Sequence, residues 1–373
     1  MNKKIILGIV LVIALILALL LAVLPQASGQ FLGINQKETI FLNAILPITG
    51  INSMYGEAQK QGIDLALEEI NRENMGKFSL EVSYEDNQSD PKVALNALQK
   101  VLTQKPKIII STMTPTTTPL LPLLKDKNII LLIGGSISAS LAPQDKYFFK
   151  DHADVIEWAN TLTTAVKEKG FKKTALIYFQ TDQGEAFATQ VKKTINPFLI
   201  EKFEATTIDF KTIALKIKQS GADSVIFAGF PKNAGAILKE MEETGPIIPT
   251  FLINANWPEV TANGTGEKIQ PYTAGHEFDK TNKTQKAIEF AEKFKAKYNK
   301  TATVESAIIY DTIKLLATKI QICGSDNECI AKELTGTHNY NATTGTINYD
   351  ENRNSARASV LLQYKDGKWT ENN

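Results

Sequence analysis

The sequence contains few of the residues from which metal centres and reactive thiols are built. Two cysteines and three widely separated histidines supply too few ligands to predict a metal site. The cysteines, Cys323 and Cys329, bracket a short polar loop. Outside the cytoplasm such a pair is expected to be oxidised. We therefore predict a disulfide between Cys323 and Cys329 and no metal.

Neither sign of charge is in excess. The chain has 41 basic and 40 acidic residues, which gives a formal net charge of +1. No long run of lysine or arginine occurs beyond the N-terminal segment. Because nucleic-acid binding depends on clustered positive charge, nucleic acid is excluded as a partner.

The sequence also lacks the motifs of the common α/β enzymes. It has no Gly-x-Gly-x-x-Gly turn, no phosphate-binding Gly-x-x-x-x-Gly-Lys-Ser/Thr loop and no Gly-x-Ser-x-Gly nucleophile elbow. Asp182 and Glu185 have the spacing of carboxylates in the first turn of a helix, where the helix dipole favours them. We therefore predict no cofactor and no enzymatic activity.

The first 37 residues form a targeting segment rather than part of a folded domain. Residues 5–24 carry no polar side chain, and a span of about 20 residues is long enough to cross a bilayer. This length favours a retained membrane anchor, while the small residues at 27–29 resemble a signal cleavage site. Lys3 and Lys4 precede the span, so the rest of the chain should be extracytoplasmic.

The remaining chain is longer than one hydrophobic core usually serves, so two lobes with a cleft between them are expected. Short runs rich in Ile, Val and Phe alternate with longer amphipathic segments. This alternation predicts an α/β fold with parallel sheets covered by helices. The predicted strands lie at 40–46, 80–84, 108–110, 129–133, 175–179, 224–228 and 250–253, and the predicted helices at 56–71, 91–104, 120–127, 155–169, 184–194, 212–220 and 233–243.

Hydroxyls and glycines gather after two of the predicted strands. Residues 111–119 hold Ser111, Thr114, Thr116 and Thr117, and residues 134–138 follow the next strand. Ligands bind beyond the carboxyl ends of the strands in open parallel sheets, where hydroxyls and helix N–H groups hold a carboxylate or amide. The alternative is that these residues only cap helices. Taken together, the two loops favour a binding site.

At these residues the chain resembles the leucine/isoleucine/valine-binding proteins, which are the substrate-binding components of branched-chain amino-acid ABC transporters. The resemblance runs from about residue 39 to 369. It is carried by 46–50 with Tyr55-Gly56 and Gly62, by 86–91, 114–118, 134–141, 178–185 and 223–235, and by 345–350.

The resemblance implies a two-lobed type I periplasmic-binding fold with a hinge of three crossover segments. The expected crossovers lie near 148–149, 275–276 and 336–346, so lobe one would be 38–148 plus 276–336 and lobe two 149–275 plus 337–373. It further implies a monomeric extracytoplasmic protein that captures a small polar solute and delivers it to permease and ATPase subunits. A ligand-sensing receptor on the same fold is the alternative.

The resemblance also implies site residues. Thr114 stands at the family's carboxylate-binding hydroxyl and Gly135 and Ser136 at its strand-end segment, while Tyr55, Phe230 and Tyr310 stand at pocket aromatics. Three positions depart from the family pattern: Ile137 replaces Thr, followed at once by Ser138; Gln183 replaces Tyr; and Ala255 replaces the acid that binds an ammonium group. Asn254, Asn256 and Gln183 suit an uncharged or anionic ligand, while Asp182 or Asp311 could replace the missing charge. A branched-chain amino acid, an amide and a carboxylic acid all remain open as ligands.

Overall fold

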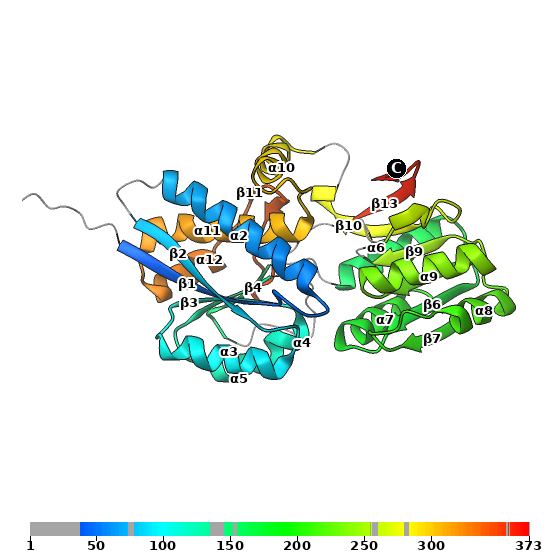
Figure 1. Ribbon diagram of the computed structural model, residues 1–373, viewed down its shortest axis with the longest axis horizontal. Coiled ribbons are helices and arrows are strands. Elements are labelled where there is room, and N and C mark those ends of the chain that lie inside the picture. Colours follow the sequence, from blue (N-terminus) through cyan, green and yellow to red (C-terminus); the bar gives the residue numbers. More distant parts are fainter. Residues whose placement is uncertain are drawn as a thin grey trace, which may run out of the picture.

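The computed structural model of the chain describes residues 38–73, 78–134, 145–151, 155–253, 255, 260–279, 283–355, 357 and 359–372. The predicted membrane anchor, residues 1–37, lies outside these ranges. Within them, no helix combines the length and the apolar character needed to cross a bilayer. The described residues form two lobes side by side along the long axis of the molecule (Figure 1), which confirms the predicted two-lobed α/β architecture.

The first lobe is built on a five-stranded parallel sheet in the order β2-β1-β3-β4-β5. Strands β3 and β4 are buried at every position, because helices cover both faces of the sheet. All carboxyl ends of the strands therefore lie at one edge. The strands are β1 (Glu38–Leu46), β2 (Phe78–Asp86), β3 (Ile108–Thr112), β4 (Ile130–Gly134) and β5 (Phe148–Asp151).

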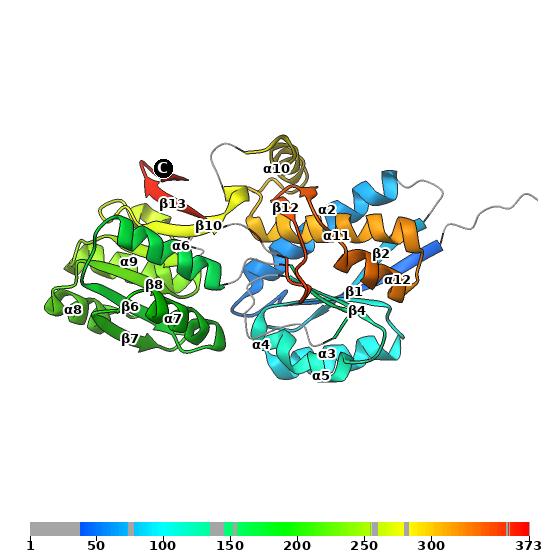
Figure 2. The same ribbon diagram turned by 180° about the vertical axis from the view of Figure 1, so that it is seen from behind.

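Helices α2 and α11 cover one face of this sheet, and α3 and α5 cover the other (Figures 1 and 2). Helices α2 and α11 pack closely: a Cβ added at Gly62 would lie 2.2 Å from the carbonyl oxygen of Ser306. The elements around the sheet are α2 (Ser53–Glu73), α3 (Pro91–Thr103), α4 (Thr114–Thr117), the 3-10 turn Thr118–Leu120, α5 (Leu121–Leu124), α10 (Gln285–Tyr298), α11 (Val304–Cys323), α12 (Asn327–Thr335), β11 (Tyr340–Ala342) and β12 (Gly345–Ile347).

The second lobe has a seven-stranded sheet in the order β14-β13-β10-β9-β8-β6-β7. Strands β6 to β10 are parallel, whereas β13 pairs antiparallel with β10 and forms a hairpin with β14. Its strands are β6 (Thr174–Phe179), β7 (Leu199–Phe203), β8 (Ser224–Ala228), β9 (Thr250–Ile253), β10 (Tyr272–His276), β13 (Ser359–Lys365) and β14 (Lys368–Glu371). Its helices are α6 (Val155–Glu168), α7 (Asp182–Thr194), α8 (Lys211–Ser220) and α9 (Pro231–Thr244).

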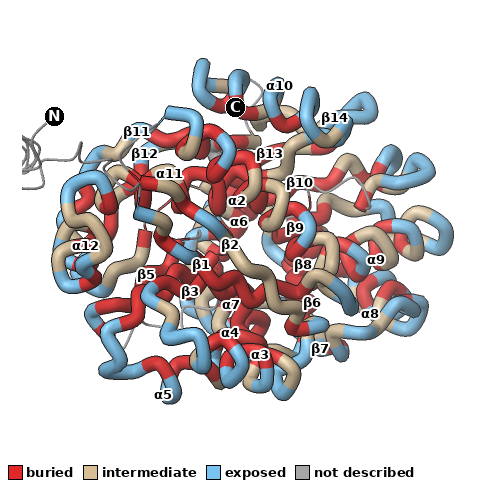
Figure 3. Tube along the Cα trace, turned by 60° about the vertical axis from the view of Figure 1, so that its left-hand side comes forward, coloured by how far each residue is buried: buried red, intermediate tan, exposed pale blue. Residues whose placement is uncertain are grey.

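Each lobe has its own apolar core, and the exposed residues lie at its periphery (Figure 3). The cores correct two of the predicted crossover positions. Residues 149–151 stay in the first lobe, because β5 pairs with β4. The hairpin β11–β12 also belongs to the first lobe, since Ala342, Ile347 and Tyr349 are buried in its core.

The ring of Tyr349 packs edge-on against Phe149, with 5.4 Å between the ring centroids. The backbone of Arg353 and Ser355 still hydrogen-bonds to Lys150 of β5, so the chain leaves the first lobe for the last time after residue 355, rather than near 336–346. The first lobe comprises the described residues of 38–151, 278–279 and 283–355, and the second those of 155–276 and 359–372.

Candidate functional site

A cavity of about 260 Å³ lies in the cleft between the two lobes. The loop after β3 borders it on the first lobe, and the starts of α7 and α9 border it on the second. The carboxyl ends of strands from both sheets thus lead into one space, as expected for ligand binding in open parallel sheets. The lining residues are Met113, Thr114, Pro115, Thr181, Asp182, Gln183 and Phe230.

A smaller cavity of about 40 Å³ adjoins the first, because Phe230 borders both. The start of α2, including Tyr55, forms its wall on the first lobe. On the second lobe the wall consists of the loop after β7 and the start of α9, where Lys232 is exposed. The predicted residues Tyr55, Thr114, Gln183 and Phe230 therefore border the cleft from both sides.

The hydroxyl-rich loop after β3 is only partly directed at the cleft. Thr116 donates to the carbonyl oxygen of Thr112 at 2.7 Å, and the hydroxyls of Ser111 and Thr117 are hydrogen-bonded to each other at 2.8 Å. Both partners lie within the loop and the strand before it. The binding role predicted for Thr116 and Thr117 stays a prediction, and in this structure their hydroxyls hydrogen-bond within the loop. Thr114, in contrast, lines the cavity.

The second-lobe wall depends on two helix starts. Thr181 caps α7 by accepting from the backbone N–H of Gly184 at 3.1 Å. A Cβ at Gly184 would lie 2.0 Å from the carbonyl oxygen of Phe179, so glycine permits α7 to begin this close to the strand. At the start of α9 the ring of Phe230 packs edge-on against Phe179, with 5.2 Å between centroids. These contacts fix the cleft-facing end of each helix.

Tyr310 and Asp311 border neither of the two cleft cavities, so their predicted binding roles stay predictions. Tyr310 is in α11, where its hydroxyl donates to Glu69 at 2.6 Å. Burial and this carboxylate together raise the pKa of Tyr310. Asp311 accepts hydrogen bonds from the backbone of Thr343 and Thr344 at 2.9 and 2.8 Å. Both side chains are therefore hydrogen-bonded to other residues of the first lobe.

Several predicted site residues lie outside the described ranges. Ala255 is described: it is buried beyond β9, and its backbone N–H donates to the hydroxyl of Thr273 at 2.9 Å. It supplies no charge to the cleft. The residues outside are Gly135, Ser136, Ser138, Asn254 and Asn256.

A buried polar network at the hinge was not predicted from the sequence. Asp151, the last residue of β5, accepts from the Nε and Nη2 atoms of Arg357 at 2.9 and 2.6 Å. Ser355 donates to the same carboxylate at 2.5 Å, and Thr312 donates to its other oxygen. Arg357 lies between the first-lobe hairpin β11–β12 and strand β13 of the second lobe. The network therefore joins the first and third crossovers.

The positive charge of Arg357 is balanced by the carboxyl groups of Asp151 and Asp311. Arg357 also donates to Thr344, whose hydroxyl donates to Asp311 at 2.6 Å. Burial raises the pKa of Asp311, against the opposing effect of the Arg357 guanidinium. Burial lowers the pKa of Arg357, but the carboxylates of Asp151 and Asp311 outweigh this and raise it. The guanidinium is thus held as a cation in the interior.

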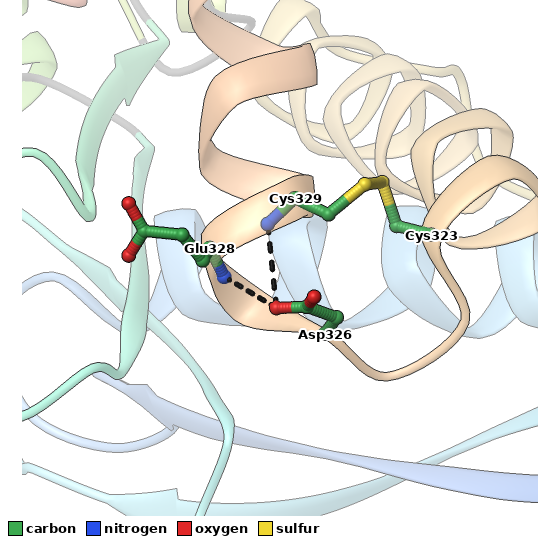
Figure 4. Close-up of a disulfide and its surroundings, with 4 residues drawn as sticks. All are labelled: Cys323, Asp326, Glu328 and Cys329. Carbon is green, nitrogen blue, oxygen red and sulfur yellow. Dashed lines mark hydrogen bonds between the residues drawn. A yellow bond between two sulfur atoms is a disulfide. The ribbon is translucent and has the colours of Figure 1, made fainter.

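The disulfide between Cys323 and Cys329 connects the end of α11 to α12 (Figure 4). The Cα atoms of the two cysteines are 5.6 Å apart. Asp326, between them, caps α12 by accepting from the backbone N–H groups of Glu328 and Cys329 at 3.0 and 3.4 Å. No metal-binding cluster of His, Cys, Asp and Glu occurs among the residues that the structure describes.

Comparison with known proteins places this geometry in a family. The model of the periplasmic binding protein family matches residues 39–368. The chain belongs to this family. A relative from Pseudomonas aeruginosa, the leucine-, isoleucine-, valine-, threonine-, and alanine-binding protein, is 23% identical over 331 residues, which cover 84% of this chain and 86% of the relative.

Solved structures of the family share the fold. The branched-chain amino acid transporter substrate binding protein LivJ from Streptococcus pneumoniae, in complex with isoleucine, has a TM-score of 0.81 and 23% identity, and covers 89% of this chain and 98% of its own. A solute binding protein of an ABC transporter from R. palustris, in complex with benzoate, has a TM-score of 0.79 and is 16% identical. The match covers 89% of this chain and 95% of the R. palustris protein.

Proposed function

We propose that the protein is the substrate-binding component of an ABC transporter. In this proposal a small solute binds in the interlobe cleft, the lobes close on it, and the closed form delivers it to a permease and its ATPase. The observation that carries the proposal is a cavity bordered by strand-end loops of both lobes. Hinge closure around a ligand is the motion that such a two-lobed arrangement allows. Family membership and the names of the relatives support it.

The cleft suits a solute with a polar head and a compact apolar body. Thr114, Thr181 and Gln183 offer hydrogen-bonding groups, while Met113 and Phe230 offer apolar surface. Ligand sites commonly combine a mostly apolar wall with a few polar groups that fix orientation. We propose that the solute is bound without chemical change, so that it is recovered intact after release.

Asp182 provides a way to distinguish ligands that have an ammonium group from ligands that do not. It is the only ionisable side chain among the described residues that line the larger cavity. Burying an ammonium group without a carboxylate partner is costly, so an α-amino acid needs Asp182 in this cavity. One relative is described with isoleucine and another with benzoate, which has no ammonium group. An Asp182→Asn variant should therefore lose affinity for an amino acid and keep affinity for an amide or carboxylic acid.

Thermal unfolding with a panel of solutes tests the binding function. The panel contains leucine, isoleucine, valine, benzoate and isovaleramide, an amide without an ammonium group. A ligand at 100 times its Kd adds about 2.7 kcal/mol of stability. With an unfolding entropy of about 2.1 cal/mol/K per residue over 373 residues, that amounts to a rise in Tm of roughly 3–4 °C. A flat response to every solute would refute small-solute binding, and mass spectrometry of the released ligand checks that it is unchanged.

We further propose that the protein is an extracytoplasmic monomer held to the membrane by residues 1–37. The apolar run 5–24 is the basis for this. The full chain should then sediment with membranes after a high-salt wash and require detergent for release. A chain that begins at residue 38 should be released without detergent and elute as a monomer. Release of the full chain by salt alone would contradict anchoring.

A further inference from the structure

Met113 has an unusual backbone conformation at the wall of the cleft. It follows β3 directly, with φ 66° and ψ 134°. Side chains clash with the backbone in this part of φ/ψ space, which glycine alone occupies readily. Conformations of this kind persist only where surrounding contacts impose them, and they are concentrated at ligand sites. The unfavourable backbone conformation of Met113 therefore indicates a role at the cleft, in addition to connecting β3 to α4.

Hydrogen bonds on both sides of Met113 hold this turn. Its carbonyl oxygen accepts from the backbone N–H of Thr117 at 3.0 Å. The hydroxyl of Thr116 bonds the carbonyl of Thr112, whose own hydroxyl accepts from Gln59 at 2.9 Å. The hydroxyls that were predicted to hold ligand thus fix the backbone around Met113.

The side chain of Met113 is directed away from its own lobe. It is 3% exposed and lines the cleft cavity with Thr114 and Phe230. Although it belongs to the first lobe in sequence, it is part of the apolar cluster that forms the core of the second lobe, as is Tyr55. Its burial therefore depends on the approach of the two lobes rather than on the packing of the first lobe alone.

We infer that Met113 is a specificity-determining residue of this cleft, which contacts the apolar body of the ligand and the second lobe when the lobes are together. The inference rests on the proposed binding function. The turn aims the thioether across the cleft, and the flexible, polarizable methionine adapts to the shape of an aliphatic or aromatic group. Because Met113 contacts both the ligand and the second lobe, the size of the ligand's apolar group affects how well the lobes close.

Three variants test this assignment. Met113→Gly removes the side chain and relieves the turn, while Met113→Leu keeps an apolar side chain. Lys105→Gly is the matched control, because Lys105 also has a positive φ of 53° but is exposed in the loop before β3, at the opposite edge of the sheet. The probes are isoleucine against alanine and benzoate against acetate, titrated by calorimetry, together with the Tm of each protein without ligand.

The expected result separates binding from folding. Met113→Gly should weaken binding of isoleucine or benzoate at least tenfold and reduce the preference over alanine or acetate, with the Tm of the unliganded protein equal or higher. Met113→Leu should stay within about threefold of the wild type, and Lys105→Gly should bind as the wild type does. Unchanged affinity and preference in Met113→Gly would overturn the inference, as would a Tm lowered by several degrees. If the wild type binds none of the probes, the proposed function is wrong, and the inference about Met113, which rests on it, is wrong as well.

Discussion

Removing the guanidinium of Arg357 should destabilise the protein more than most single substitutions. Its partner Asp151 lies at the end of β5, and the two side chains are 3% and 1% exposed. In Arg357→Met the carboxylate keeps hydrogen bonds from the hydroxyls of Ser355 and Thr312 but loses its ion pair with the guanidinium. A buried charge without an opposite charge is the expected outcome.

The magnitude follows from that burial. Removing one partner of a buried ion pair costs about 3–5 kcal/mol. With an unfolding entropy of about 2.1 cal/mol/K per residue over 373 residues, the loss corresponds to a decrease in Tm of roughly 4–6 °C. The assay is urea denaturation followed by circular dichroism, with Tm as a second measure. The double variant Asp151→Asn with Arg357→Met should recover most of the loss, because the neutral amide can accept from the Ser355 hydroxyl through its oxygen and donate to the Thr312 hydroxyl through its NH2 group.

An exposed pair provides the control. Lys216 and Glu201 are 2.8 Å apart, with side chains 49% and 21% exposed. Surface pairs contribute at most about 1 kcal/mol, so Lys216→Met should have a small effect. If Arg357→Met were no more destabilising than Lys216→Met, or if the double variant recovered nothing, the reasoning about buried charge would be refuted.

Two further predictions concern the first lobe. Replacing Cys323 and Cys329 with serine should lower the free energy of unfolding by about 2 kcal/mol, because the bond closes a loop with a sequence separation of 6; equal urea midpoints for the variant and the oxidised wild type would contradict this. Burial raises the pKa of Glu69, but hydrogen bonds from Lys293 and Tyr310 outweigh it and hold the pKa below its usual 4.5. The carboxylate therefore contributes stability at neutral pH that is lost as the pH falls through the lowered value, and Glu69→Gln should show a shallower loss of stability in acid. Identical pH profiles for Glu69→Gln and the wild type would exclude this role.

Much of the strand and helix order could be predicted, because apolar runs bounded by polar loops mark the buried strands of a parallel sheet. Strand β7 was not predicted, since this edge strand alternates exposed and partly buried residues instead of forming an apolar run. The predicted helix at 120–127 is a 3-10 turn followed by the short helix α5, because Pro119 and Pro122 remove backbone donors there.

The site was predictable only in part, for physical reasons. The sequence indicates a hydroxyl-rich loop at a strand end, yet it does not show which hydroxyls are used within the loop, as those of Thr116 and Thr117 are. A single methionine is typical of a core, so Met113 carried no signal. The bond from Arg357 to Asp151 joins residues 206 positions apart, and no local pattern indicates it.

The interleaved course of the chain has a consequence for its synthesis. The five strands of the first lobe are made early, but the carboxylate of Asp151 receives its cation only when Arg357 has been added. Strands β13 and β14, which complete the sheet of the second lobe, follow immediately. Both lobes therefore reach their final form through the same last stretch of chain. A nascent protein that stops before residue 357 would leave two incomplete lobes, and folding should be completed late and in one event.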